Sequence, residues 1–230
     1  MLARVIGKDI HKEDRAMFTE QKEIRKEERK TGNMKSMKTG TREKSEIDKT
    51  LISSLLNHLI LKEKLDGANA VLDYLLKVYP NDFWLLTKKS SVYHEMHDYK
   101  KALEFSKKAL AQNANSPLVL WDYACNLDMM GKEKEAIAAW EKIISFGVQE
   151  VALHLTEEGK EWAESLINDS LLRISVSYFE IGEQAIAVTY LRKYLANRKS
   201  GQASIYSEKE MREMIHAVSK KKFQQLGVAA

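Results

Sequence analysis

The sequence repeats with a period of 34 residues over three successive segments, and this period constrains the fold more strongly than any other feature. When the chain is aligned with itself at this shift, Ala68 falls on Ala102 and then on Ala136. No residue has to be inserted between the three units, which comprise residues 49–82, 83–116 and 117–150. A fixed period of this length is typical of solenoid proteins, in which one supersecondary unit stacks on the next.

The chain has too few prolines and glycines for a turn-rich fold. It contains 2 prolines and 10 glycines in 230 residues, whereas average usage would give roughly 11 and 16. A β-sandwich, a β-barrel or a Rossmann domain needs more turns than this, so the composition favours helices joined by short connections. Pro80 and Pro117 fall at unit junctions, and Gly131 and Gly182 fall where turns inside the units are expected.

Each unit has the pattern of a helical hairpin that cannot bury its apolar face alone. Small residues such as Ala68 and Ser90 occupy positions where two helices would cross closely. Larger residues, among them Leu86, Tyr93 and Trp140, suit the gaps between neighbouring hairpins. Stacking of neighbours would bury these side chains in one continuous core.

The units resemble tetratricopeptide repeats. The unit 83–116 carries the matching residues Leu86, Ser90, Tyr93, Tyr99, Ala102 and Ala109. The unit 117–150 carries Leu120, Ala124, Leu127, Gly131, Ala136, Trp140 and Ile143. The resemblance implies an all-α fold, a right-handed α-solenoid of about four helical hairpins (the TPR superhelix) with a C-terminal capping helix.

A fourth unit, 168–200, fits the same template but begins 17 residues later than the period predicts. The segment 151–167 is therefore interpreted as an insertion. Apolar residues at helical spacing predict that the first helix of this unit is extended and runs from Lys160 to Ile181. The region Gly159 to Tyr206 also resembles the C-terminal part of a group of bacterial repeat proteins without an established activity.

The two ends of the chain differ from the repeats between them. Residues 1–48 contain 13 Lys/Arg and 10 Asp/Glu, which predicts a charged arm that is loosely helical or disordered. Residues 201–230 are predicted to form a capping helix and a tail. Ser207 and Glu210 have the spacing of a capping box, and Met211 and Met214 begin an apolar face.

Charge and cysteine content narrow the functional classes. The net charge of +4 is small, whereas nucleic-acid binders usually show a larger, clustered excess. The single cysteine, Cys125, excludes an intramolecular disulfide framework and a CxxC zinc site, and it favours a reducing cytosol. The beginning of the sequence has no pattern of a signal peptide, and no apolar stretch is long enough to span a membrane.

The resemblance further implies a concave surface lined by the first helix of each hairpin. The residues that we expect to contact a ligand there are Asn57, Trp84, Lys88, Ser91, His94, Trp121, Asp122, Cys125, Asp128 and Arg173. Trp84 and Trp121 are the strongest candidates, because rigid amphipathic side chains often carry binding energy. The alternative is that one or both pack between helices, as we expect for Trp140 and Trp162.

No motif predicts catalysis, a metal site or a cofactor. His94 and His97 lie three residues apart, which is a weak zinc signal, and a solvated pair beside a turn explains them as well. Acidic neighbours should keep Cys125 an inert thiol. Only Asn57 matches the clamp with which some tetratricopeptide domains bind a C-terminal carboxylate, and Asp122 would repel such a group.

These observations predict a non-enzymatic, cytoplasmic, bacterial repeat protein that binds a peptide or protein segment in its concave groove. Two alternatives remain open. One is a substrate-specific secretion chaperone, and the other is an RNA- or ribosome-associated factor that uses the basic N-terminal arm. Neither membrane nor nucleic acid is the expected partner, and the sequence does not identify the partner or the oligomeric state.

Overall fold

The computed structural model describes residues 47–154 and 159–225, and within them every regular element is a helix. The helices are α2 (Lys49–Leu61), α3 (Leu65–Val78), α4 (Phe83–Glu95), α5 (Tyr99–Gln112), α6 (Pro117–Met129), α7 (Glu133–His154), α8 (Gly159–Glu180), α9 (Gln184–Lys199) and α10 (Glu208–Gln225). None of these helices combines the length and apolarity needed to cross a membrane. The predicted charged arm lies almost wholly outside the described residues.

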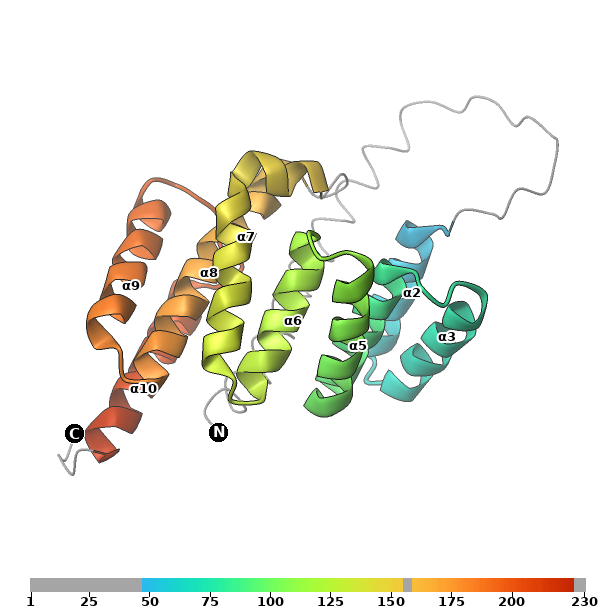
Figure 1. Ribbon diagram of the computed structural model, residues 1–230, viewed down its shortest axis with the longest axis horizontal. Coiled ribbons are helices and arrows are strands. Elements are labelled where there is room, and N and C mark those ends of the chain that lie inside the picture. Colours follow the sequence, from blue (N-terminus) through green and yellow to red (C-terminus); the bar gives the residue numbers. More distant parts are fainter. Residues whose placement is uncertain (1–46, 155–158, 226–230) are drawn as a thin grey trace.

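The helices form four hairpins that lie side by side in chain order (Figure 1). The first and second helices pair as α2/α3, α4/α5, α6/α7 and α8/α9, and each second helix also packs against the first helix of the next hairpin. The first helices α4 and α6 contact each other as well. The prediction of an all-α solenoid of helical hairpins with a C-terminal capping helix is confirmed.

The turn inside each hairpin has the same unusual backbone conformation. One residue per turn has a positive φ, and these residues are Glu63 (57°), His97 (60°), Gly131 (70°) and Gly182 (91°). The first three are 34 residues apart, and the fourth follows after a further 51, the period plus the 17-residue slip. This left-handed conformation strains residues that carry a Cβ atom, so the turns of the first two hairpins are less favourable than those of the last two.

The helices of a hairpin cross at small side chains. The four equivalent alanines are fully buried, and they are Ala68, Ala102, Ala136 and Ala187. In two hairpins a buried serine of the first helix donates a hydrogen bond to the carbonyl of this alanine. Ser90 Oγ lies 2.9 Å from the Ala102 oxygen, and Ser175 Oγ lies 2.9 Å from the Ala187 oxygen.

The largest apolar cluster lies where α6, α7 and α8 meet. Trp140 is completely buried in it, and Trp162 packs against it while half-buried, so the expected core position is confirmed for Trp140 and met in part by Trp162. The helix α7 bends at Gly147, where φ is 72° and ψ is 162°. The helix α8 confirms the predicted extended helix.

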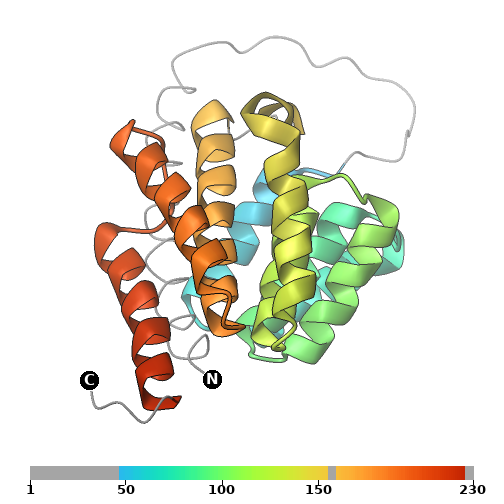
Figure 2. The ribbon, with the colours of Figure 1, turned by 60° about the vertical axis from the view of Figure 1, so that its left-hand side comes forward.

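The C-terminal helix α10 packs against α8. Figure 2 shows α10 at the end of the row of hairpins. Its capping box is confirmed, because the Ser207 N–H donates to Glu210 Oε2 (2.6 Å) and the Glu210 N–H donates to Ser207 Oγ (3.2 Å). Met214 is buried in a cluster with side chains of α8 and α9. The first helix of the fourth hairpin is therefore covered by the cap.

Candidate functional site

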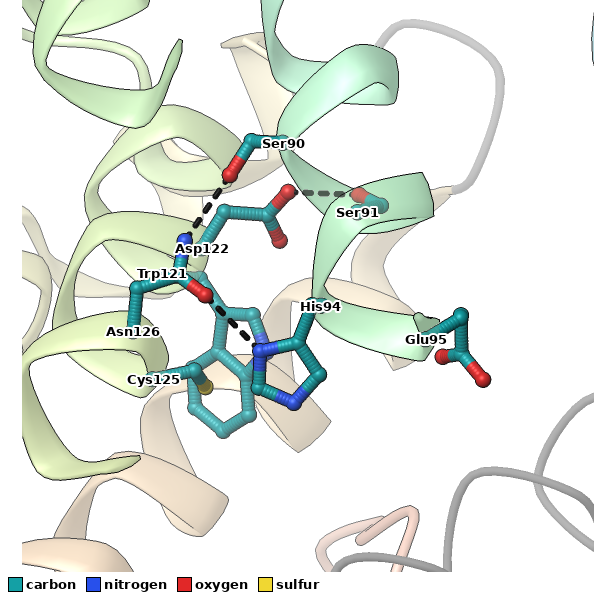
Figure 3. Close-up of a pocket in the computed structure, with 8 residues that line it drawn as sticks. All are labelled: Ser90, Ser91, His94, Glu95, Trp121, Asp122, Cys125 and Asn126. Atoms are coloured by element: carbon teal, nitrogen blue, oxygen red, sulfur yellow. Dashed lines mark hydrogen bonds between the residues drawn. The ribbon is translucent and has the colours of Figure 1, made fainter. Parts of the chain in front are cut away.

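A small pocket of about 110 Å³ lies between α4 and α6, the first helices of the second and third hairpins (Figure 3). Its walls come from these two helices alone and consist of Ser90, Ser91, His94, Glu95, Trp121, Asp122, Cys125 and Asn126. Five of the ten predicted groove residues meet here, namely Ser91, His94, Trp121, Asp122 and Cys125. The pocket is thus built in part from positions that the resemblance assigned to a ligand surface, whereas Ser90 and Asn126 were not among them.

A chain of hydrogen bonds fixes the inner wall of the pocket. Asn126 Nδ2 donates to Ser90 Oγ (2.8 Å), which in turn donates to the Ala102 carbonyl. His94 Nδ1 lies 2.8 Å from Asn126 Oδ1. Because an amide oxygen only accepts hydrogen bonds, Nδ1 of His94 must carry the hydrogen. The orientation of the imidazole is therefore set by a relay through Asn126 and Ser90 (Figure 3). The relay ends at the Ala102 carbonyl on α5.

A second hydrogen bond joins the two helices beside this relay. Ser91 Oγ donates to Asp122 Oδ2 at 2.7 Å, and the same hydroxyl lies 3.1 Å from the Thr87 carbonyl. Hydrogen bonds to ionised carboxylates are stronger than those between neutral groups. The Asp122 carboxylate consequently has a defined position in the pocket.

Trp121 and Cys125 provide the less polar part of the wall. The half-buried Trp121 ring packs against the main core, with its centroid 6.5 Å from that of Trp140. Cys125 is 7% exposed, and burial raises the pKa of its thiol to about 12. A thiol with this pKa is protonated at neutral pH and is a poor nucleophile.

Asp128 and Arg173, two other predicted groove residues, are paired with each other. Their charged groups lie 3.3 Å apart, and their side chains are only 5% and 15% exposed. Ser177 Oγ donates to Asp128 at 3.4 Å, and the Arg173 guanidinium lies 5.6 Å from the centre of the Trp140 ring. Burial raises the pKa of Asp128, and Arg173 opposes this effect. The charges of Asp128 and Arg173 are therefore paired with each other inside the protein.

The remaining predicted residues, Asn57, Trp84 and Lys88, lie outside the pocket. Asn57 is half-buried on α2. Trp84 packs against the core of the first hairpin, and the ammonium groups of Lys49 and Lys88 lie 5.9 and 5.5 Å from its ring centre. The two candidate tryptophans therefore differ, because Trp121 lines the pocket and Trp84 joins neighbouring hairpins.

Two residues of the pocket relay were missed as site residues from the sequence. Ser90 was interpreted only as a small residue at a helix crossing. Asn126 is equivalent to Val92 one unit earlier and is 1% exposed. A polar side chain at a buried apolar position needs a hydrogen-bond partner. A polar residue at a position that is apolar in the preceding repeat was therefore the sequence signal that could have identified Asn126.

A second buried polar cluster holds the connection to the cap. Asp169 accepts hydrogen bonds from Ser204 Oγ and from the Ile205 N–H (2.9 Å), and Asn168 Nδ2 donates to the Ala203 carbonyl (3.2 Å). Burial raises the pKa of Asp169 to about 7. These bonds tie the segment before α10 to α8, which explains how the cap is positioned.

The two histidines considered for zinc have separate partners. His94 bonds with Asn126, whereas His97 Nδ1 lies 2.9 Å from the Tyr99 hydroxyl. Over residues 47–154 and 159–225, no three His, Cys, Asp or Glu side chains are grouped so that they could hold a metal ion.

This chain is similar to one curated protein and to two solved structures. Protein SABRE of Arabidopsis thaliana is 26% identical over 121 residues, which make up 52% of this chain and only 5% of that protein. Two crystal structures of MamA have identities of 20% and 19%, cover 64% and 69% of this chain and 96% of their own, and give TM-scores of 0.38 and 0.40. These TM-scores are too low to bear on function.

The tetratricopeptide repeat family matches residues 169–199, which lie on α8 and α9. The three earlier hairpins share with this one the buried alanine at the helix crossing and the positive-φ turn residue. The matched hairpin is therefore a tetratricopeptide repeat, and the three earlier hairpins share its design.

Proposed function

We propose that this protein is a non-enzymatic module that binds a peptide or protein segment along the concave surface formed by its first helices. Tetratricopeptide repeats are protein–protein interaction scaffolds, and their partners are generally proteins. The proposed contact surface is centred on the pocket between α4 and α6. The proposed setting is the cytosol, where Cys125 would remain a thiol.

The observation that carries this proposal is the fixed geometry of the pocket. Bonds from Ser91 to Asp122 and from His94 to Asn126 connect α4 to α6 across the hairpin boundary. A surface whose side chains are already ordered loses little conformational entropy when a ligand binds. Trp121 adds a half-buried aromatic wall of the kind that often dominates interface energies.

A catalytic role has less support. Cys125 is the one thiol of the chain, and its raised pKa of about 12 makes it a poor nucleophile at neutral pH. The Nδ1 atom of His94 is bonded to the amide oxygen of Asn126, which fixes the orientation of the ring. Both groups are better explained as parts of a binding surface.

The test is affinity purification from native lysate with the wild type and two single variants. Trp121→Ala removes the pocket wall, and Trp84→Ala is the matched control outside the pocket. We expect Trp121→Ala to lose partners that Trp84→Ala retains, with circular dichroism showing that both variants are folded. Recovery of every partner by folded Trp121→Ala in wild-type amounts would contradict the proposal.

A further inference from the structure

We propose that residues 8–30 of the N-terminal arm dock as a helix on the exposed face of α2, in the place that the second helix of a preceding hairpin would occupy. This surface, the edge face, is defined by Leu51, Leu55 and His58. It shares no residue with the pocket between α4 and α6, so the inference does not depend on the proposed function.

The positions of the edge face are covered in every later hairpin. On α2, Leu51 is 66% and Leu55 is 44% exposed, and His58 is exposed as well. In the later first helices the equivalent residues are buried, except that Tyr123 is half-buried. They are Leu85, Lys89 and Val92 on α4, Val119, Tyr123 and Asn126 on α6, and Ser170, Ile174 and Ser177 on α8. The first hairpin therefore leaves open a surface that the repeat otherwise buries.

The cover in the second hairpin comes from the hairpin before it. Leu85 and Val92 of α4 pack in one cluster with Leu72 of α3. Lys89 Nζ lies 2.7 Å from Asp73 Oδ1, also on α3. Among the described residues no hairpin precedes α2, which lies with α3 at one end of the row (Figure 1). The edge face is thus the counterpart of a surface to which a helix such as α3 binds.

An uncovered apolar surface at the end of a solenoid favours association with other molecules. Solenoids therefore generally end in a unit whose outer side is polar. At the C-terminal end of this chain, α10 packs against α8 in this way. A helix on the edge face would provide the same protection at the other end.

The arm has the chain position and the length to reach the edge face. Residues 1–46 lie outside the described residues and lead directly to α2, which begins at Lys49. Residues 31–46 can span roughly 50 Å when extended, whereas the 13 residues of α2 make a helix about 20 Å long. The tether also gives the arm an effective concentration of about 1 mM, which favours it over a second molecule.

The arm carries an apolar stripe of the kind that this surface needs. Ile10, Met17 and Ile24 are seven residues apart, and Phe18 adjoins Met17. This spacing places the side chains on one face of a helix. The residues between them are mostly charged. A helix with this sequence would cover Leu51 and Leu55 with its apolar side and present a polar side to water.

The experiment is limited digestion of the full chain with trypsin under native conditions. Cleavage within residues 8–30 produces chains that begin between residues 9 and 31, and mass spectrometry measures how fast they first appear. Docking protects these sites in the wild type. We expect them to be cut at least about tenfold faster in Leu51→Gln/Leu55→Gln, because loss of two apolar contacts raises the fraction of molecules with a released arm.

Tyr74→Gln/Val78→Gln on α3 is the matched control. Its two apolar residues are also four positions apart and are 68% and 53% exposed. Their equivalents on α5, Lys108 and Gln112, are exposed too, so the repeat does not cover these positions. The control should be cut at the wild-type rate. Equal rates in the wild type and in Leu51→Gln/Leu55→Gln would overturn the proposal.

A variant of the arm tests the same contact without changing the repeats. Met17→Ser/Ile24→Ser should also be cut at least about tenfold faster than the wild type. It decides the outcome should Leu51→Gln/Leu55→Gln not fold, and an unchanged rate would then overturn the proposal. Light scattering separates the arm from a second copy of the chain. A wild-type dimer that becomes a monomer in Leu51→Gln/Leu55→Gln would show that a second copy covers the edge face, and it would overturn the assignment to the arm.

Discussion

The junction between α4 and α6 and the junction between α6 and α8 form contacts at equivalent positions of the repeat, but with different side chains. In the first, His94 bonds with Asn126 on the next first helix, and in the second, Asp128 accepts a hydrogen bond from Ser177. Asp128 follows His94 by 34 residues, and Ser177 follows Asn126 by 51. The same connection between hairpins therefore recurs, although different side chains make it.

The two junctions differ in the contact that their carboxylates make. Arg173 neutralises Asp128 inside the protein, so the α6–α8 junction is closed. At the equivalent position, Asp122 accepts a hydrogen bond from Ser91 and lines the pocket beside Trp121. The comparison teaches that the repeat supplies the scaffold, while the residue at one register position decides which contact joins neighbouring hairpins, a hydrogen bond at Asp122 or an ion pair at Arg173.

The largest expected effect on stability comes from removing the cation of the α6–α8 junction. Arg173→Met leaves the Asp128 carboxylate buried without its cation, and loss of one member of a buried pair costs about 3–5 kcal/mol. Urea denaturation should show this loss of stability. The double variant Asp128→Asn/Arg173→Met should recover most of it, and failure to recover would show that the ion pair is not the cause.

The cap beside this junction should make stability depend on pH. The pKa of Asp169 is about 7 in the folded protein, above the ordinary value of 3.8, mainly because of burial, and Ser204 and the Ile205 N–H oppose the shift. The folded state therefore holds this proton more tightly than the unfolded state does. The resulting stabilisation is complete below about pH 4 and is lost as the pH rises to about 7.

Asp169→Asn isolates this contribution, because its amide cannot titrate. The free energy of unfolding of the wild type minus that of the variant should fall between pH 4 and 7, by at most about 1.4 kcal/mol per pH unit, and stay level above pH 7. A difference that rises over this range would reverse the sign and contradict the account.

The serines at the helix crossings, Ser90 in the second hairpin and Ser175 in the fourth, allow these two hairpins to be compared directly. Ser175→Ala removes one bond, to Ala187, and should cost about 1 kcal/mol. Ser90→Ala also leaves Asn126 Nδ2 without its acceptor, so we expect a loss of about 2 kcal/mol. Equal losses in thermal or urea denaturation would mean that the relay behind the pocket does not contribute.

The smallest effect is expected at the hairpin turns. His97 has a φ of 60°, whereas the equivalent Gly131 adopts 70° without strain from a Cβ atom. His97→Gly should stabilise the second hairpin by about 0.5–1 kcal/mol, after loss of the bond to Tyr99 is included. Gly131→Ala is the reciprocal variant and should destabilise. A loss of stability in His97→Gly would mean that the bond outweighs the strain.

The fold could be predicted because its determinants are local and repeat. Periodicity placed the hairpins, and the spacing of Ser207 and Glu210 predicted the cap box that the structure confirms. The site could be predicted only in part. Template positions name which face a residue occupies, but whether Asp128 faces a ligand depends on Arg173, which lies 45 residues away on another hairpin. Such pairs arise from packing between repeats, which no local pattern records.

The central claim is that a ligand binds at the α4–α6 pocket and not at the closed junction, and the four tryptophans can report on it. The indole N–H signals of Trp84, Trp121, Trp140 and Trp162, assigned by single substitution, can be followed by NMR while a partner recovered by the affinity purification is added to the full chain. We predict that the Trp121 signal shifts most and that the signal of Trp140, which is fully buried, stays in place. A titration in which Trp121 stays in place while the signal of Trp84 or Trp162 shifts would contradict the account.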